Sequence, residues 1–416
     1  MSIFRPADIL LPRVSEWERW SVIACDQFTS EPDYWDEAER IAGDAPSALR
    51  LILPEAWLGT ERAGNAAGRI AEAMHEYYDN GIMYTIPSSF VYIERTQPDG
   101  RIRRGLLGAL DLESYDFAPG NTAPVRATED TVADRLPPRI AVRRGALLEL
   151  PHIMLLADDR TESVLGTLAG EKAELPLLYD FELMLGGGRI RGYQVSGERA
   201  EKAEAAVAAL GAPAAQREKY GWDGEPMVIA VGDGNHSLAA AKRWWEELRE
   251  TLTPAERETH PARFALCELM NIQDAAIDFE PIHRVLLQTD AADFLREAAS
   301  LCGTMPGSDF TVRFIAEGQE RSLKAGGLTV GELIGRCESF AREYLSSHGG
   351  RIDYIHGDES CRSLASGQGC CGILLPPMNK GDLFSSVLRS GAFPRKSFSI
   401  GHSRDKRYYL EARKIR

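Results

Sequence analysis

The residues best suited to chemistry lie in one short segment, Gly232-Asp233-Gly234-Asn235-His236-Ser237. Gly232 and Gly234 can adopt backbone conformations closed to other residues, and they let a ligand approach the main chain. Asp233 and His236 can move a proton, and Asp233 can also hold a cation such as Mg²⁺. The segment therefore predicts a site for a small charged ligand.

This segment is expected to join a strand to a helix. Met227 to Val231 is a short apolar run that predicts a strand, and a helical pattern is plain from Leu238 onward. The first N–H groups of a helix have no partner inside it, and the helix dipole favours negative charge there, so such a start binds anions. An ordinary strand-to-helix corner, capped by Asp233 or Asn235, would show the same pattern. Both interpretations stay open at this point.

Three better-known loops do not match the segment. The GxxxxGK[ST] pattern of a Walker loop occurs nowhere in the chain. The GxGxxG pattern of dinucleotide-binding folds fails because Ser237 stands at the last glycine and the following stretch stays helical. In the GxSxG elbow of hydrolases the serine lies at the turn, whereas Ser237 comes after it.

The composition indicates an acidic globular protein. The chain has 416 residues, with 48 Lys and Arg against 62 Asp and Glu, and a formal net charge of −14. A negative bulk charge opposes binding to nucleic acid or to an anionic membrane. No apolar run is long enough to span a membrane, the start does not resemble a signal peptide, and the seven cysteines form no CxxC pair. We expect a cytoplasmic protein that acts on a small molecule, without nucleic acid or membrane as a partner; a homo-oligomer is left open.

The C-terminal segment differs in charge from the rest. Between Arg389 and Arg416 there are nine Lys or Arg and two Asp or Glu, an excess of seven positive charges. Such a segment can hold a phosphate-bearing ligand, or it can pair with the acidic bulk of its own chain. Both possibilities are open.

Strand and helix patterns alternate along the chain and predict a mixed α and β protein. A β-hairpin is predicted from Ser89 to Leu110 around the turn Gln97-Pro98-Asp99-Gly100, and a second from Leu177 to Val195. The polar segment Gly211 to Glu225 is predicted to be a connecting loop. His152, just before an apolar run, is predicted to be a core histidine rather than a ligand.

Several blocks in this order resemble the uncharacterised family known as domain of unknown function ten-fifteen, over nearly the whole length. They are SVIACDQFTSEPDYW, RATEDTVADRLPPR, DGNHSLAAAK, NIQDAAIDFEPIHRV, ILLPPMNKGDLF and FPRKSFSIGHSRDKRYYLEARKI. The DG[HN]H turn also resembles, more remotely, the phosphate-binding turn of the ParB/sulfiredoxin-like superfamily, which includes free-serine kinases with a DGHHR-type loop. This resemblance implies phosphoryl transfer or nucleotide hydrolysis on an α+β core.

Residues 233–237 can be compared with the DGHHR-type loop one position at a time. Asp233, Gly234 and His236 match the DGHHR-type loop, whereas Asn235 stands where the first histidine would be and Ser237 where the arginine would be. A planar guanidinium is hard to replace on a phosphate, so another cation must reach in or the ligand must differ. Glu129 is the best match to the glutamate that acts as the base in those kinases.

Together these observations predict a phosphotransferase that acts on a small hydroxylated metabolite, in the manner of a free-serine kinase, with a nucleotide or pyrophosphate as donor and Mg²⁺ as a cofactor. The alternatives are a non-catalytic nucleotide-binding regulator and a metabolite phosphatase or other hydrolase. The predicted catalytic residues are Glu129, Asp233 and His236, with Asp233 also as the metal ligand. The predicted phosphate- and nucleotide-binding residues are Gly232, Gly234, Asn235, Ser237, Arg126, His283, Arg284 and Lys396.

The expected fold class is α+β, with mixed sheets and helices. Residues 1–295 are predicted to form a ParB/sulfiredoxin-like domain that binds phosphate or nucleotide and carries insertions. Residues 296–416 are predicted to form a smaller C-terminal α/β domain, whose basic tail contributes to the site.

Overall fold

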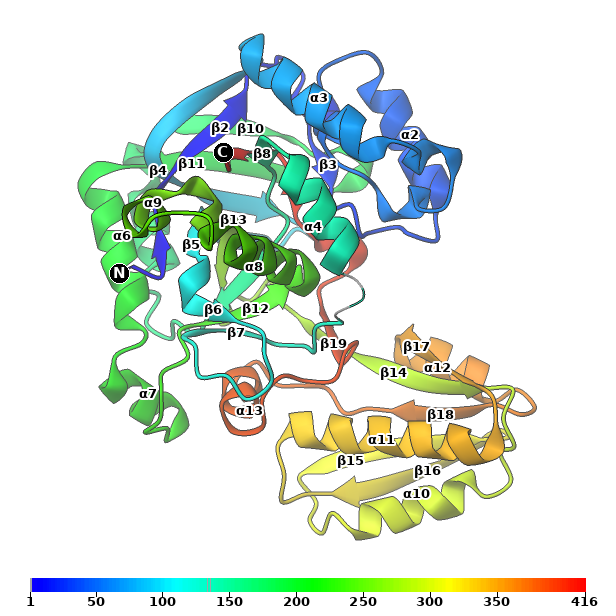
Figure 1. Cartoon of the computed structure of the whole chain (residues 1–416). Helices are drawn as coiled ribbons and strands as arrows, with labels where there is room; N and C mark the ends of the chain where they lie inside the picture. The colour runs from blue at the N-terminus through cyan, green and yellow to red at the C-terminus, as the bar shows by residue number, and fades with distance from the viewer. Residues whose placement is uncertain (1, 133, 135) are drawn as a thin grey trace. The chain divides into compact units, whose positions relative to one another are not determined.

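The computed structural model describes residues 2–132, 134 and 136–416 and divides the chain into two compact units (Figure 1). Unit 1 comprises residues 1–127, 131–277 and 401–416, and unit 2 comprises residues 128–130 and 278–400. Each unit has its own sheet, with helices covering it. The α+β class predicted from the sequence is confirmed.

The sheet of unit 1 has eleven strands among the described residues, nine of them in the order β10-β11-β4-β5-β13-β9-β12-β7-β6. Both predicted hairpins lie in it, as β4 with β5 and as β10 with β11. Strand β1 pairs with β5, and β2 with β4. The strands are β1 (Phe4–Arg5), β2 (Ala7–Pro12), β4 (Met83–Thr96), β5 (Ile102–Asp111), β6 (Tyr115–Asp116), β7 (Val125–Ala127), β9 (Met154–Ala157), β10 (Leu177–Glu182), β11 (Arg189–Val195), β12 (Ile229–Asp233) and β13 (Phe264–Asn271).

Helices and short 3-10 turns surround this sheet. The α-helices of unit 1 are α1 (Trp17–Trp20), α2 (Pro32–Ala42), α3 (Ala66–Asp79), α4 (Leu136–Gly145), α5 (Leu165–Glu171), α6 (Gly197–Ala209), α7 (Pro213–Tyr220), α8 (Asn235–Arg249) and α9 (Pro254–Thr259). The predicted loop from Gly211 to Glu225 is wrong, because α7 lies within it. Pro213 opens that helix at a position where its missing N–H costs nothing, and Gly221 ends it in the left-handed conformation.

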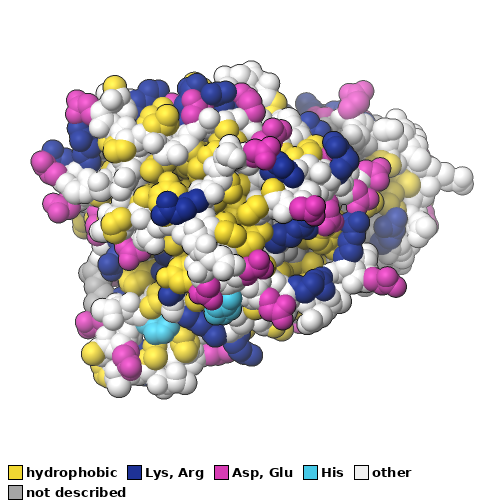
Figure 2. All heavy atoms as spheres, turned by 90° about the horizontal axis from the view of Figure 1, so that it is seen from above, with side chains coloured by type: hydrophobic (Ala, Val, Ile, Leu, Met, Phe, Trp, Pro, Cys, Tyr) yellow, Lys and Arg dark blue, Asp and Glu magenta, His cyan; other side chains and the backbone are white. Residues whose placement is uncertain are grey.

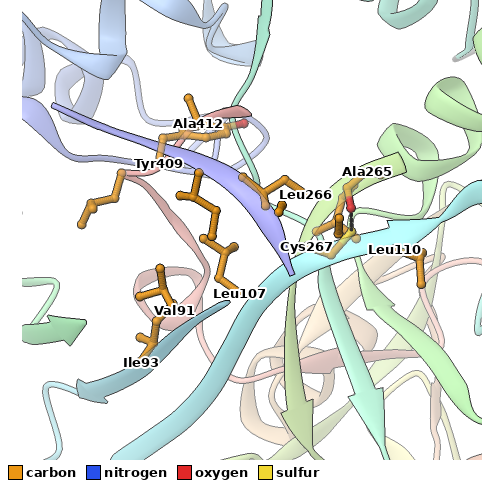
Figure 3. Close-up of a cluster of buried hydrophobic side chains, with 14 of the residues drawn as sticks. Val91, Ile93, Leu107, Leu110, Ala265, Leu266, Cys267, Tyr409 and Ala412 are labelled. Atoms are coloured by element: carbon orange, nitrogen blue, oxygen red, sulfur yellow. Dashed lines mark hydrogen bonds between the residues drawn. The ribbon is translucent and has the colours of Figure 1, made fainter. Parts of the chain in front are cut away.

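The last part of the C-terminal segment, residues 401–416, is part of the core of unit 1, whereas residues 389–400 belong to unit 2. Strand β20 (Tyr408–Tyr409) pairs with β3 (Val22–Ile23), β21 (Arg413–Lys414) pairs with β8 (Leu148–Glu149), and a bridge joins Leu10 to Ala412. Figure 3 shows apolar side chains of β4, β5, β13 and this segment in one buried cluster, among them Val91, Ile93, Leu107, Leu110, Ala265, Leu266, Cys267, Tyr409 and Ala412. Burial of apolar surface therefore holds the last residues of the chain in place.

Two basic residues of this part of the chain pair with buried acidic side chains of unit 1. Arg407 lies 3.1 Å from Glu268, and Arg413 lies 2.7 Å from Glu149. Of the two possibilities left open by the sequence, the structure therefore supports pairing within the chain for these residues. On the face drawn in Figure 2, Lys and Arg side chains are likewise interspersed with Asp and Glu.

Unit 2 has a six-stranded sheet among the described residues, in the order β16-β15-β18-β14-β17, with β19 added beside β14. The strands are β14 (Phe279–Leu287), β15 (Phe310–Ala316), β16 (Gln319–Ala325), β17 (Arg351–His356), β18 (Cys371–Leu374) and β19 (Phe398–Ile400). The helices are α10 (Phe294–Gly303), α11 (Val330–His348), α12 (Asp358–Ala365) and α13 (Asp382–Ser390). The domain division between residues 295 and 296 stays a prediction. The compact units follow strand pairing instead, since β14 pairs with strands of unit 2.

Candidate functional site

The glycine-containing segment forms a tight corner in unit 1. Strand β12 ends at Asp233, Gly234 has φ 78° and ψ 24°, and α8 begins at Asn235. A Cβ at Gly234 would lie 3.0 Å from the Cα of Ile153, so the corner needs glycine both for its left-handed conformation and for its space. The expected strand-to-helix corner is therefore present, with Gly234 itself at the N-cap.

Neither Asp233 nor Asn235 caps the helix with its side chain. The Oδ1 atom of Asp233 instead accepts a hydrogen bond from the N–H of Gly234 at 2.8 Å. The first turn of α8 therefore keeps N–H groups that have no partner within the helix, those of Asn235 and Ser237 among them. With the positive end of the helix dipole, this turn can bind an anion.

A cation from the C-terminal segment lies at the corner. The Nζ atom of Lys406 is 3.1 Å from Oδ2 of Asp233, and the Lys406 side chain is only 9% exposed. Burial alone would raise the pKa of the Asp233 carboxyl, but attraction and hydrogen bonding from Lys406 bring that pKa below its usual value. Asp233 is thus a carboxylate at neutral pH. The corner therefore combines this carboxylate, the ammonium group of Lys406 and the N-terminus of α8.

The geometry does not favour Asp233 as a metal ligand. Its two carboxylate oxygens already accept from Gly234 and Lys406. In the part of the chain that the structure describes, no group of three or more His, Cys, Asp and Glu side chains could hold a metal ion. A protein-held Mg²⁺ stays a prediction without support from these contacts.

His236 is held by the segment that precedes α4. Its Nε2 atom accepts a hydrogen bond from the backbone N–H of Val132 at 3.2 Å. The proton of the neutral ring is then on Nδ1, since an accepting nitrogen carries none. In the neutral ring, Nε2 is thus occupied by the Val132 N–H, and Nδ1 is a hydrogen-bond donor.

Ser237 and His152 form a pair that the sequence did not predict. The Oγ atom of Ser237 is 3.0 Å from Nε2 of His152, and the hydroxyl of Tyr409 is 2.8 Å from Nδ1 of the same ring. His152 is half-buried, with polar partners at both nitrogens, so its description as a core histidine misses its role as a link between α8 and β20.

The guanidinium of Arg126 has backbone partners in unit 1. It lies on β7, is buried, and donates from Nε to the carbonyl oxygen of Ala123 at 2.8 Å and from Nη2 to that of Glu225 at 3.1 Å. Burial lowers its pKa from the usual value. These contacts give Arg126 a structural function in joining two loops.

The other predicted residues belong to unit 2. The carboxylate of Glu129 accepts from the backbone N–H groups of Lys396 at 3.2 Å and Ser397 at 3.0 Å. Lys396 has a positive φ of 58°, a conformation that non-glycine residues rarely adopt. Glu129 thus holds the turn before β19, and the fold brings two of the predicted residues, Glu129 and Lys396, into contact.

His283 and Arg284 both lie on β14 and have partners inside unit 2. His283 is 3.0 Å from Asp358 through Nε2, and its Nδ1 accepts from the N–H of Leu375 at 3.2 Å; burial lowers its pKa. Arg284 is fully buried, lies 3.0 Å from Glu338, and donates to the carbonyl oxygen of Lys396 at 3.1 Å. Through these contacts, both side chains contribute to the packing of unit 2.

A family model described as "Protein of unknown function (DUF1015)" matches residues 7–356. The chain belongs to this family. The match extends over most of the chain and confirms the resemblance carried by the sequence blocks. No curated protein matches the chain significantly.

Solved structures similar to this chain are remote in sequence. SbnI with C-terminal truncation from Staphylococcus aureus is 8% identical, with a TM-score of 0.36 over 71% of this chain and 82% of that one. A free serine kinase mutant in complex with ADP is 10% identical, with a TM-score of 0.37 over 76% and 93% of the two chains. Free serine kinase in complex with AMP is 11% identical, with a TM-score of 0.37 over 74% and 91%.

Within the described residues, no helix is both long and apolar enough to cross a membrane.

The corner residues Gly232 to Ser237 were predicted together, and they lie together. Lys406, His152 and Tyr409 were missed as site residues. The basic C-terminal segment was the one signal for Lys406, whereas nothing in the sequence connects His152 with Ser237 or Tyr409.

Proposed function

We propose that this protein is a phosphotransferase that binds the phosphates of a nucleotide or pyrophosphate at the N-terminus of α8 and transfers a phosphoryl group to a small hydroxylated metabolite. The observation that carries the proposal is the corner at Gly234. Gly234 has a left-handed backbone conformation and is the N-cap of α8. The preceding residue, Asp233, lies 3.1 Å from Lys406. An anion there meets backbone donors and the helix dipole together.

The chemistry of phosphoryl transfer fits these groups. Such a transfer needs donors around the phosphate oxygens, positive charge near them and a group that orients the acceptor hydroxyl. The N–H groups of α8 meet the first need, and Lys406 is a cation for the second. This supplies positive charge although Ser237 replaces the arginine of the DGHHR-type loop.

The resemblance of the DG[HN]H turn to free-serine kinases supports the same reaction class. Catalysis by Glu129, Asp233 and His236, and ligand binding by Arg126, His283, Arg284 and Lys396, remain predictions from that resemblance. The nucleotide or pyrophosphate donor and the Mg²⁺ ion are parts of the proposal as well.

Binding is tested by isothermal titration of the full chain with ADP, ATP and pyrophosphate, each with and without Mg²⁺. We expect saturable binding of at least one of them. A folded sample that binds none of the three would contradict the proposal.

The near-isosteric change Asn235→Asp tests the position of the ligand. A carboxylate in the first turn of α8 is compatible with the helix dipole, so the fold is retained, but it repels a phosphate bound there. We expect affinity to fall at least about tenfold, the factor that corresponds to about 1.4 kcal/mol. Ala214→Asp is the matched control, because Ala214 is exposed in the first turn of α7. Equal effects of the two changes would place the ligand elsewhere.

A non-catalytic nucleotide-binding regulator is the second candidate. It is favoured by Glu129, the predicted base, whose carboxylate accepts from two backbone N–H groups. A turnover assay with ATP and small alcohols, free serine first, separates the candidates. Binding without any product would favour the regulator, and phosphate release without an acceptor would favour a hydrolase.

A further inference from the structure

We propose that Ser237 is a nucleophile that accepts the phosphoryl group before the acceptor does, with His152 as its base and Tyr409 as the residue that positions His152. The inference rests on the proposed function and adds an enzyme-bound phosphoserine to it. It follows from a continuous series of contacts in unit 1 that joins Ser237, His152, Tyr409 and Cys25.

The nucleophile and its base are in direct contact. Ser237 Oγ lies 3.0 Å from His152 Nε2, within the reach required of a hydroxyl and the base that deprotonates it. Ser237 is in the first turn of α8, so its hydroxyl lies beside the N–H groups proposed to hold the phosphate. A serine hydroxyl alone is a weak nucleophile, and the imidazole is the group that activates it.

The hydrogen bonds around Tyr409 decide which nitrogen of His152 carries the proton. The Tyr409 oxygen accepts from the backbone N–H of Cys25 at 3.3 Å, and its O–H donates to Cys25 Sγ at 3.1 Å. At 2.8 Å from His152 Nδ1 the oxygen can then only accept. We therefore place the ring proton on Nδ1, which leaves Nε2 as an acceptor for Ser237.

Both groups behind His152 stay neutral. Burial raises the pKa of the Cys25 thiol to about 12 and raises the pKa of the Tyr409 hydroxyl well above its usual value. Neither group therefore competes with His152 for protons near neutral pH. Their function is to hold the ring in one orientation, in the way a third group orients the base in other nucleophile and base pairs.

The fold keeps these residues in place. Tyr409 is 2% exposed and pairs with Val22 between β20 and β3. His152 directly precedes Ile153, the residue against which Gly234 packs at the corner. Two independent tertiary contacts therefore set the distance between the imidazole and α8.

The reaction balances in two steps. In the first, the Ser237 proton moves to His152 Nε2, an Oγ–P bond forms, and the bond between the phosphorus and the leaving nucleoside diphosphate or phosphate breaks. The leaving group takes the electron pair. In the second, the acceptor hydroxyl attacks the phosphorus and loses its proton to water, while the imidazolium returns its proton to Oγ as the P–Oγ bond breaks.

The test is incubation of the full chain with γ-labelled ATP or labelled pyrophosphate in the absence of an acceptor, followed by mass spectrometry of the peptides. We expect a phosphoserine at Ser237 that disappears when the acceptor is added. Ser237→Ala abolishes it, and His152→Asn slows its formation about 100-fold, the low end for loss of a general base. The matched control is Ser385→Ala, a half-buried serine in the first turn of α13.

Tyr409→Phe tests the positioning function. We expect slower labelling of Ser237, a changed pH profile of the labelling rate, and unchanged donor binding by titration. A purely structural role would leave the pH profile as it is and would argue against the assignment of Tyr409.

The outcomes separate this inference from the proposed function. Transfer to an acceptor at an unchanged rate in Ser237→Ala would overturn the phosphoserine step alone. Failure of every donor to bind the wild-type chain would overturn the proposed function, and this inference with it.

Discussion

Asp233 in unit 1 and Glu338 in unit 2 are both carboxylates paired with a cation, yet their surroundings differ. Asp233 is 27% exposed and adjoins the first turn of a helix, where backbone donors remain available. Glu338 lies against Arg284, which is fully buried, and also accepts from the hydroxyl of Tyr354 at 2.8 Å. The comparison teaches that a charged residue can serve a ligand only where its partners leave part of its surroundings open.

The largest effect is expected from breaking the buried pair of unit 2. Arg284→Met takes from the Glu338 carboxylate its buried cation and leaves only the half-exposed Arg342, 2.6 Å away, so we expect a loss near the lower end for a broken buried pair, about 3 kcal/mol of unfolding free energy. The double change Arg284→Met with Glu338→Leu should recover most of that loss, because no uncompensated charge then remains. Denaturant unfolding of the three proteins measures both values. A small loss in the single variant would show that the pair is not the structural contact we describe.

Gly234→Ala should give the next largest effect. A left-handed alanine costs about 1–2 kcal/mol, and contact of its Cβ with Ile153 adds to this. Gly59 has a φ of 80° and open space where a Cβ would lie, with nothing within 4 Å, so Gly59→Ala isolates the backbone cost. We expect Gly234→Ala to be the more destabilising of the two by denaturant unfolding. Equal costs would mean that the corner has room for a side chain.

Replacing the cation at the corner should change the pH dependence of stability. The Asp233 carboxyl has a lowered pKa in the folded chain, so its stabilisation is present at neutral pH and is lost as the pH falls below the ordinary value of 3.8 and through the folded one. In Lys406→Met, burial is no longer offset, and the pKa of Asp233 should rise.

Unfolding free energies of wild type and Lys406→Met between pH 7 and pH 3 check this expectation. The wild type should lose about 1 kcal/mol more than the variant over that range, since the pair is partly screened by solvent. Lys414→Met, which removes a lysine stacked on Tyr78, is the control. Parallel pH curves for wild type and Lys406→Met would contradict the pairing.

The smallest effect is expected at an exposed pair. Lys202 and Glu198 lie 2.8 Å apart on α6, but both side chains are mostly exposed, so solvent screens them. Lys202→Ala should leave the thermal unfolding midpoint unchanged by scanning calorimetry. A clear decrease would show that distance alone, and not burial, decides the contribution of an ion pair here.

Much of the local structure was predictable from the sequence. The turn Gln97-Pro98-Asp99-Gly100 and the apolar run before Gly232 predicted the hairpin and the strand that the structure shows. The loop predicted from Gly211 to Glu225 was wrong because a polar composition hides the weak helical signal of α7. The spacing of apolar and turn-forming residues reflects the backbone conformations that a segment prefers. Those preferences determine where most short helices, strands and turns form.

The sequence by itself determined the class of the fold, its family and the glycine corner, because turn geometry and hydrophobic period depend on neighbours along the chain. Only the tertiary structure decided which side chains meet at that corner. Lys406 and Tyr409 reach Asp233 and His152 because burial of residues 401–416 in the core of unit 1 brings distant parts of the chain together. The hydrophobic effect depends on the apolar area that is buried and not on the order of residues along the chain. The spacing of residues in the sequence therefore could not predict these contacts.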